Sequence, residues 1–431
     1  MLPPLQPPLR LLDPDALDLA AFVRPGDRIV CGQCTAEPLT LTRRLVAQAA
    51  ALGPLEVFVG PLFSDTFAPA DLPAGALRFR GYGAMGAASA LWAAGLLDVV
   101  PIHYSALDAA YASGALQAEV VLLQLAPPPP GAPAGTPFSL GLANDYAAQA
   151  ARHARVVIAE VNPAVPWTRD AALPADVEVA ALVAAAFPPL EVAPAKVGPV
   201  ERAIAGHVAG LVPDRATLQI GIGAIPDAVL AGLSGHRDLG IHSGVVGDRM
   251  VDLIAAGAVT NAHKTIDQGL SVTNTLIGTR RTYDHAARDP GLRVRPAAYT
   301  HGPAALGALE RFFAINSCVE VDLSGQVNAE QAGGAYVGGT GGLLDFSRAS
   351  RGGRAVLALP ATARRGAVSR IVPRLARTTV AGSDVDVVVT EHGVADLRGA
   401  AMAERARRLV AVAAPAFRED LARAAGELAH A

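Results

Sequence analysis

Glycine-rich turns that follow apolar runs are the first candidates for chemistry in this sequence. A short apolar run from Leu218 breaks at Gly221 and Gly223, and a helical pattern resumes behind Pro226. Such a turn brings free backbone N–H groups and the positive end of a helix dipole to one point, where an anion or a developing oxyanion can bind. Glycine turns after strands are common in α/β proteins, so an ordinary connection explains this one equally well.

A second glycine loop has the sequence Gly338-Gly339-Thr340-Gly341-Gly342. Glycines on both sides of a single threonine allow the backbone to approach a ligand closely, particularly a phosphate or a thioester carbonyl. We therefore treat Gly339, Gly341 and Gly342 as candidate binding residues, together with Gly221 and Gly223.

His242 is a further candidate for chemistry. It ends an apolar run from Leu239, which we expect to be a strand that stops at Ser243-Gly244 before another helix. The imidazole is a candidate general base for hydrolysis or a core histidine hydrogen-bonded at a strand end, and we favour the structural role. Asp248 follows, and we expect it to cap the next helix.

The cysteines do not form a metal site in our reading. Cys31 and Cys34 make a C-x-x-C pattern, but no second cysteine pair or histidine cluster completes a zinc site. We interpret them as ordinary small residues of a turn.

Length and patterning predict the elements that position these residues. A chain of 431 residues, 51% hydrophobic, is too long for one ordinary core, and two α/β domains are expected. Apolar runs alternate with alanine-rich helical stretches, which indicates βαβ units and mostly parallel sheets. Proline-rich sequence near residue 190 suggests domains at 1–190 and 191–431. A closing amphipathic helix is expected from Ala401 to Ala425.

Composition excludes several classes of protein. The formal charge of −3 argues against a dedicated nucleic-acid binder. No uninterrupted apolar run reaches the ~18 to 20 residues of a membrane span, and the N-terminal stretch lacks the features of a signal peptide. We expect a cytoplasmic protein with no membrane and no nucleic-acid partner.

Four motifs in order resemble the acetyl-CoA hydrolase/transferase family. They read GIGAIPDAVL, then IHS…GD..VDLI..GAVTN..KT.D.G, then NS..EVDLSGQVNAE….Y.GGTGG..DF, then TEHGVADLRG….ER. This group of class I coenzyme A transferases includes 4-hydroxybutyrate CoA-transferase. The resemblance implies two NagB/RpiA-like α/β domains with the active site in the interdomain cleft.

The resemblance also implies a covalent mechanism. A glutamate of the enzyme attacks the acyl-CoA thioester, and the released CoA thiolate converts the acyl anhydride into a glutamyl-CoA thioester. In the family the glutamate follows the second strand of the first motif region, where this chain has Gly244. A branch of the family carries Ser-Gly here and keeps CoA chemistry, so we look for a substitute carboxylate in the first domain.

Two carboxylates of the first domain are candidates for this role. Asp65 follows a buried strand in GPLFSDTF, and Glu37 lies in the loop GQCTAEP after the first strand. Each has a structural alternative, as an N-cap for Asp65 and as a first-turn acid for Glu37. Glu320 and the thiol of Cys34 are weaker choices.

From the residues and the resemblance together we expect a CoA-transferase that moves CoA between a short acyl-CoA, such as acetyl- or succinyl-CoA, and a small carboxylic acid. Coenzyme A would be a substrate, with no tightly bound cofactor, and the enzyme would be a homodimer. An acyl-CoA hydrolase and a non-catalytic CoA-binding protein are the alternatives.

Overall fold

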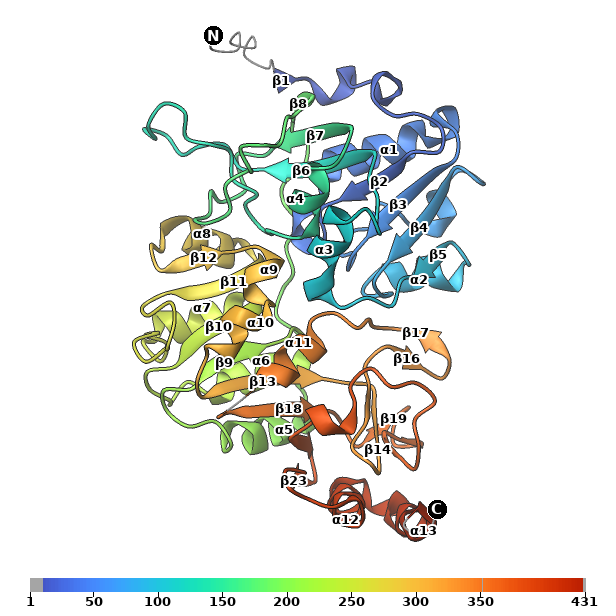
Figure 1. Cartoon of the computed structure of the whole chain (residues 1–431), viewed down its shortest axis with the longest axis vertical. Coiled ribbons are helices and arrows are strands. Elements are labelled where there is room, and N and C mark those ends of the chain that lie inside the picture. The colour runs from blue at the N-terminus through green and yellow to red at the C-terminus, as the bar shows by residue number, and fades with distance from the viewer. Residues whose placement is uncertain (1–10, 351, 429–431) are drawn as a thin grey trace. The chain divides into compact units, whose positions relative to one another are not determined.

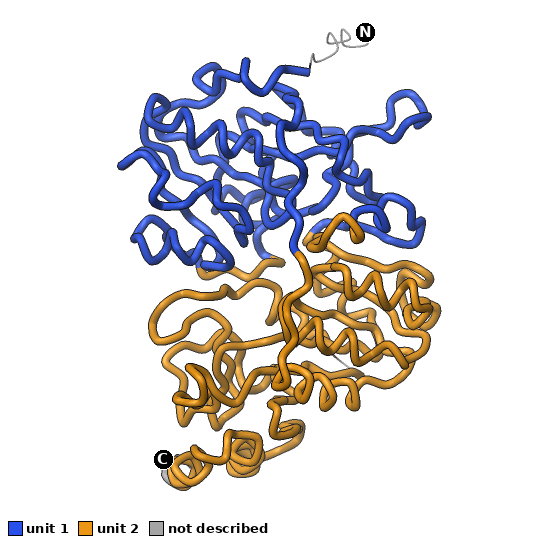
Figure 2. The backbone as a smooth tube through the Cα atoms, turned by 180° about the vertical axis from the view of Figure 1, so that it is seen from behind, with its two compact units in different colours: residues 1–100, 106–192, 283–296 blue, residues 101–105, 193–282, 297–431 orange. Residues whose placement is uncertain are grey.

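The computed structural model describes residues 11–350 and 352–428. The chain divides into two compact units, coloured separately in Figure 2. The first contains residues 1–100, 106–192 and 283–296, and the second contains residues 101–105, 193–282 and 297–431. Each unit is a mostly parallel sheet with helices against its faces (Figure 1), which confirms the expected α/β fold class.

The first unit is built on parallel strands in the order β1-β8-β7-β6-β2-β3-β4-β5. The strands are β1 (Leu11–Leu12), β2 (Arg28–Cys31), β3 (Leu55–Val59), β4 (Leu77–Gly81), β5 (Leu97–Val99), β6 (Val120–Leu125), β7 (Val156–Val161) and β8 (Ala181–Ala184). The accompanying elements are α1 (Leu39–Leu52), α2 (Ala88–Ala93), α3 (Leu107–Ala112), α4 (Tyr146–Ala151) and β12 (Leu292–Val294).

Burial explains why these runs become strands. Every residue of β6 is buried, as expected for a central parallel strand that is covered on both faces. The helix α1 buries Leu41, Leu45 and Ala49 on one stripe, which is the helical spacing that the sequence shows.

The second unit has its main sheet in the order β11-β10-β9-β13-β18-β22-β23. The strands are β9 (Thr217–Ile220), β10 (Gly240–Val246), β11 (Ser271–Leu276), β13 (Phe312–Ser317), β18 (Arg354–Ala358), β22 (Val387–Thr390) and β23 (Gly393–Asp396), of which β23 is antiparallel. The helices are α5 (Pro199–Ala209), α6 (Ala224–Gly232), α7 (Asp248–Ala255), α9 (Ala297–Thr300), α10 (Pro303–Gly307), α11 (Leu343–Ala349), α12 (Met402–Val412) and α13 (Arg418–Leu428). Helix α8 (Arg280–Arg288) spans the change of unit at residue 283.

Short strands outside this sheet complete the second unit. β14 (Glu320–Asp322) pairs with β15 (Val327–Asn328) and β21 (Ile371–Val372), and two small hairpins are formed by β16 (Gln331–Ala332) with β17 (Ala335–Tyr336) and by β19 (Thr362–Ala363) with β20 (Val368–Ser369). The carboxylate of Asp322 is buried and accepts hydrogen bonds from Ser324 and Gln326, so it closes the turn after β14.

Three expectations about local structure are wrong. The strand β10 does not stop at Ser243 but continues to Val246, because its parallel ladder to β11 runs through Val245. The closing segment is two helices, α12 and α13, because Pro415 begins a separate turn between them. Asp248 lies inside α7 and its carboxylate accepts from Thr279 and Thr282, so it ties two segments together rather than capping the helix.

No helix of the described residues is long and apolar enough to cross a membrane.

Replacing Asp145 by Asn should reduce the pH dependence of stability. Burial raises the pKa of Asp145 to about 7, although the backbone N–H groups of Ala147 and Gln33 donate to its carboxylate. The folded state therefore keeps a proton that the unfolded state loses from about pH 4, so the free energy of unfolding falls up to about pH 7 and is level above. At about 1.4 kcal/mol per pKa unit, this group should account for a fall of about 3 kcal/mol between about pH 5 and pH 8.

Urea unfolding of the natural chain and of Asp145→Asn at these two pH values measures the difference. Asp71→Asn, which changes an exposed carboxylate, should follow the natural chain. Parallel pH curves for Asp145→Asn and the natural chain would contradict the prediction.

Candidate functional site

The turn after β9 is the first part of the candidate site in the second unit. The strand ends at Ile220, and Gly223 forms the N-cap of α6 with φ of 117°. This backbone conformation strongly favours glycine, since it strains residues that carry a Cβ. A side chain at Gly221 would begin 3.6 Å from Oδ1 of Asn316, which lies on β13. The turn thus places its backbone groups at the carboxyl ends of the neighbouring strands β9 and β13.

The Ser243-Gly244 pair lies on β10, next to this turn. The Ser243 hydroxyl donates to the carbonyl oxygen of Ile220 at 3.1 Å, which ties the two strands together where β9 ends. Gly244 is half-buried and has no side chain to offer. The position at which the family resemblance implies a nucleophile therefore carries only backbone.

His301 lies directly against Gly244. A Cβ added at Gly244 would be 3.0 Å from Nε2 of this histidine, and one added at Gly342 would be 2.8 Å from Nε2 and 2.5 Å from Cδ2. The imidazole is flanked by the rings of Tyr104 and Phe346, with centroids 4.7 and 4.5 Å away. We call these five residues the His301 cluster.

A short segment from the first half of the sequence completes the cluster. The N–H of Tyr104 donates to the carbonyl of Gly341 at 2.9 Å, and the Thr340 hydroxyl donates to the carbonyl of Ile102 at 2.8 Å. The Ser105 hydroxyl donates to the carboxylate of Asp345, on α11, at 2.7 Å. Residues 101–105 are in this way fastened to the second glycine loop, and Gly341 and Gly342 are held beside His301.

The polar residues of the IHS and KT.D.G motifs brace β10. His242 is fully buried, and its Nε2–H donates to the carbonyl of Thr300 at 3.0 Å. The ammonium group of Lys264 is buried and donates to the carbonyls of Ile241 at 2.9 Å and Leu270 at 2.7 Å. The side chain of Asn261 accepts from the N–H of Ile241. These contacts fix the strand that carries Gly244.

Glu37, in the first unit, is a fully buried carboxylate. The hydroxyls of Ser64 and Thr42 donate to its two oxygens at 2.7 and 2.9 Å. Burial raises the pKa of Glu37, and these two hydrogen bonds act against that rise. Burial leaves this carboxylate poorly solvated, and the two hydroxyls hold it in place. Such a carboxylate is chemically suited to act as a base or nucleophile.

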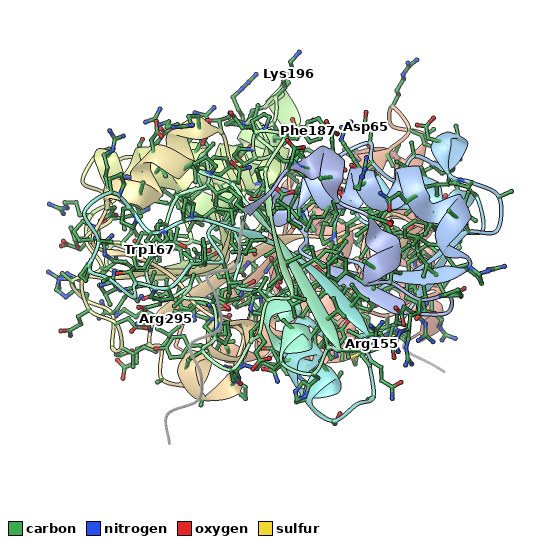
Figure 3. The ribbon with its side chains drawn as sticks, turned by 90° about the horizontal axis from the view of Figure 1, so that it is seen from above. Asp65, Arg155, Trp167, Phe187, Lys196 and Arg295 are labelled. Atoms are coloured by element: carbon green, nitrogen blue, oxygen red, sulfur yellow. The ribbon has the colours of Figure 1, made fainter. Side chains whose placement is uncertain are left out.

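Asp65 has the opposite environment. Its side chain is 82% exposed and forms an ion pair with Arg43 at 3.0 Å. The same guanidinium lies 4.9 Å from the centre of the Phe187 ring, and Figure 3 shows Asp65 and Phe187 at the outer edge of the molecule. Of the two candidate carboxylates in the first unit, only Glu37 lies in a buried polar setting.

The remaining candidates have structural surroundings. Cys31 and Cys34 are buried free thiols, and burial raises the pKa of each, which opposes formation of a reactive thiolate. Across residues 11–350 and 352–428, no group of three metal-binding side chains is found. Glu320 accepts a hydrogen bond from Asn328 across the β14–β15 pair.

Sequence reasoning missed His301 and Tyr104. His301 stands in the stretch YTHGP, and the sequence alone gives no sign that it packs on Gly244. The available signal was the pair of glycines at 244 and 342, because two positions without side chains leave room for a bulky group from elsewhere.

Comparisons with known proteins identify the class of this fold and site. The C-terminal domain of the acetyl-CoA hydrolase/transferase family matches residues 278–425. The 4-hydroxybutyrate coenzyme A transferase of Clostridium kluyveri is 40% identical over 333 residues, which are 76% of this chain and 77% of that protein.

Two solved structures share the fold at 30% identity. RipA from Yersinia pestis has a TM-score of 0.88, with 97% of this chain and 98% of RipA covered. The 4-hydroxybutyrate CoA-transferase of Porphyromonas gingivalis has a TM-score of 0.79, with 98% and 97% covered. The fold is that of the CoA-transferases. The chain belongs to the acetyl-CoA hydrolase/transferase family, as the four motifs predicted.

Replacing Lys264 by Met should destabilise the second unit. Met has a similar length but leaves the carbonyls of Ile241 and Leu270 without these two hydrogen bonds. Each unsatisfied buried group costs about 1 to 3 kcal/mol, so we expect the free energy of unfolding to fall by about 3 kcal/mol in urea denaturation.

The matched control is Lys196→Met. Lys196 is exposed and points outward in Figure 3, so its loss should change stability by less than about 0.5 kcal/mol. Equal effects of the two substitutions would show that the Lys264 hydrogen bonds do not support β10.

Proposed function

We propose that this protein is a CoA-transferase that moves coenzyme A between a short acyl-CoA, such as acetyl- or succinyl-CoA, and a small carboxylic acid. The observation that carries the proposal is the 40% identity with a 4-hydroxybutyrate coenzyme A transferase over three quarters of the chain. The glycine turn after β9 supports it, because Gly223 forms the N-cap of α6, and backbone N–H groups at a helix N-terminus can stabilise the tetrahedral oxyanions that acyl transfer requires.

The nucleophile that we propose is a carboxylate of the first unit, Glu37 or Asp65, with Glu37 favoured. Its oxygen attacks the thioester carbonyl carbon, and the C–S bond breaks. This step releases the CoA thiolate and forms an anhydride between the acyl group and the enzyme carboxylate. The thiolate then attacks the enzyme carbonyl of the anhydride and releases the donor acid. The second acid then attacks the enzyme–CoA thioester, which releases the CoA thiolate and forms a new anhydride. The thiolate attacks the acyl carbonyl of this anhydride, which gives the new acyl-CoA and frees the enzyme carboxylate. The buried setting of Glu37, with its raised pKa, favours this residue over the solvated Asp65.

Acyl-CoA hydrolysis is the second candidate function. The absence of a side chain at Gly244 favours it, since a chain without a carboxylate at that place can still polarise a thioester for attack by water. The hydrolytic reaction differs from transfer only in the acceptor, which is water instead of a carboxylate.

We also propose that the enzyme is a cytoplasmic homodimer that uses CoA as a substrate and holds no cofactor tightly. Acyl-CoA thioesters and small carboxylates are metabolites of the cytoplasm, and two-fold dimers are the commonest symmetric assembly of such enzymes. Analytical ultracentrifugation measures the mass of the assembly against the chain mass of 44.0 kDa.

Incubation with acetyl-CoA separates the functions. A transferase should form a new acyl-CoA only when a second carboxylate, such as 4-hydroxybutyrate or succinate, is present, and borohydride should trap a thioester on the enzyme. Release of free CoA without an acceptor acid would instead establish a hydrolase. Retained CoA binding without turnover in any mixture would rule out both enzymes.

Glu37→Gln should lower the rate of transfer by at least about 1,000-fold, because an amide cannot form the anhydride. The effect is measured as kcat with saturating acetyl-CoA and acceptor, while circular dichroism checks the fold. Asp65→Asn should have a much smaller effect.

Glu160→Gln is the control for removing a buried carboxylate. Glu160 is also buried, and burial raises its pKa to about 7, but it receives the N–H of Thr40 and has no proposed part in the reaction. Full activity of Glu37→Gln and loss of activity in Asp65→Asn would move the assignment to Asp65, and full activity in both would exclude both.

A further inference from the structure

The edge of the His301 ring faces two glycines that belong to separate motifs. Its Nε2 would be 3.0 Å from a Cβ added at Gly244 and 2.8 Å from one added at Gly342. Gly342 has φ of −93°, which alanine also adopts, so it is the close approach of the ring and not the backbone that excludes a side chain there. The ring therefore lies beside the position at which the family resemblance implies a nucleophile.

The surroundings of His301 keep its imidazole neutral. Burial, together with the nearby His242, lowers the pKa of His301 to about 3. The groups that face it are the Tyr104 and Phe346 rings, His242 and the hydroxyl of Thr300, and none of these is a carboxylate. A base of this strength is poor at accepting a proton, whereas a neutral imidazole is an effective hydrogen-bond donor.

The two ring nitrogens have different partners. Nδ1 lies 2.9 Å from the hydroxyl of Thr300, which can donate to it and leave the ring proton on Nε2. In the part of the chain that the structure describes, no residue hydrogen-bonds to Nε2, and the residue keeps 5% of its surface exposed. The donor is thus buried, oriented by its packing and available to a ligand.

We propose that His301 is a catalytic residue whose neutral Nε2–H donates a hydrogen bond to the acyl carbonyl oxygen of the CoA thioester beside Gly244. This inference rests on the proposed acyl-CoA chemistry. When a carboxylate attacks the carbonyl carbon, a C–O bond forms and the C=O π pair moves to the oxygen, where Nε2–H stabilises the negative charge. The pair returns as the C–S bond breaks and the thiolate leaves, and the imidazole keeps its proton throughout.

Substitution of His301 tests the donor. His301→Phe keeps an aromatic ring between Tyr104 and Phe346 but removes the N–H, so kcat should fall on the order of 100-fold while KM changes less than about threefold. His301→Gln can present an amide N–H near the same place and should recover part of the rate. Unchanged kcat in folded His301→Phe would overturn the proposal, as would equal losses in the Gln and Phe variants.

Gly342→Ala provides a second test that leaves the histidine in the chain. The added methyl group must displace the ring, because it would lie 2.5 Å from Cδ2. We expect a fall in kcat, measured at a temperature at which circular dichroism shows that the variant is folded. The control is Gly235→Ala, where an added Cβ meets nothing within 4 Å. A kcat of Gly342→Ala equal to that of the natural chain would contradict the proposal.

¹⁵N NMR of the imidazole nitrogens reports on the proposed hydrogen bond of His301 without requiring turnover. The signal of His301, assigned by its loss in His301→Phe, should show the Nε2–H tautomer and no titration between about pH 5 and pH 8. Addition of acetyl-CoA without an acceptor acid should shift Nε2, while exposed His207 should not move. An Nδ1–H tautomer, or an unshifted signal when acetyl-CoA is bound, would overturn the assignment.

The proposed function and the proposed donor role of His301 can fail separately. If the natural chain transfers CoA and the His301 variants are unaffected, the function stands and the donor role is wrong. If the natural chain neither transfers nor hydrolyses, the proposed function and a catalytic role for His301 both fail.

Discussion

The close approach of one imidazole to two glycines is the constraint on which the second unit depends. His301 can lie beside β10 only because positions 244 and 342 carry no side chain. A Cβ at 342 must displace the ring and one at 244 would press against it, and the ring in turn is packed between Tyr104 and Phe346. The glycines at 244 and 342 and the histidine that packs against them thus form one steric arrangement.

The polar residues of a motif need not take part in its chemistry. Lys264 and Asn261 have side chains that often act in catalysis, yet here both hold backbone groups of residue 241. A buried ammonium group that satisfies carbonyls at the end of a strand fixes the position of that strand firmly. The groups of this region that are available for chemistry belong to the glycines that these residues position.

The α/β architecture was predictable because buried parallel strands are mostly apolar runs, as β6 and β7 show with one polar residue each. The turn at Gly223 was predictable for a similar local reason, since its positive φ strongly favours glycine. The place of His301 was not, because its contact with Gly244 is made by tertiary folding and leaves no periodic pattern. The closing helix was predicted too long because the helical spacing outweighed Pro415, which in fact separates α12 from α13.

The division of the chain into units bears on the order in which they can fold during synthesis. The first unit includes residues 283–296, where Arg295 pairs with Asp170 at 2.8 Å and the N–H of Val294 donates to the carbonyl of Arg169. A ribosome releases these residues only after most of the second unit has been made, so the first unit cannot complete its contacts as soon as residue 192 emerges. The segment 101–105 has the reverse problem, because Tyr104 is made long before the loop at Gly341 that it joins. The first unit therefore completes its contacts only after residues 193–282 of the second unit have been made, and residues 101–105 wait for their partners until the loop at Gly341 has been made.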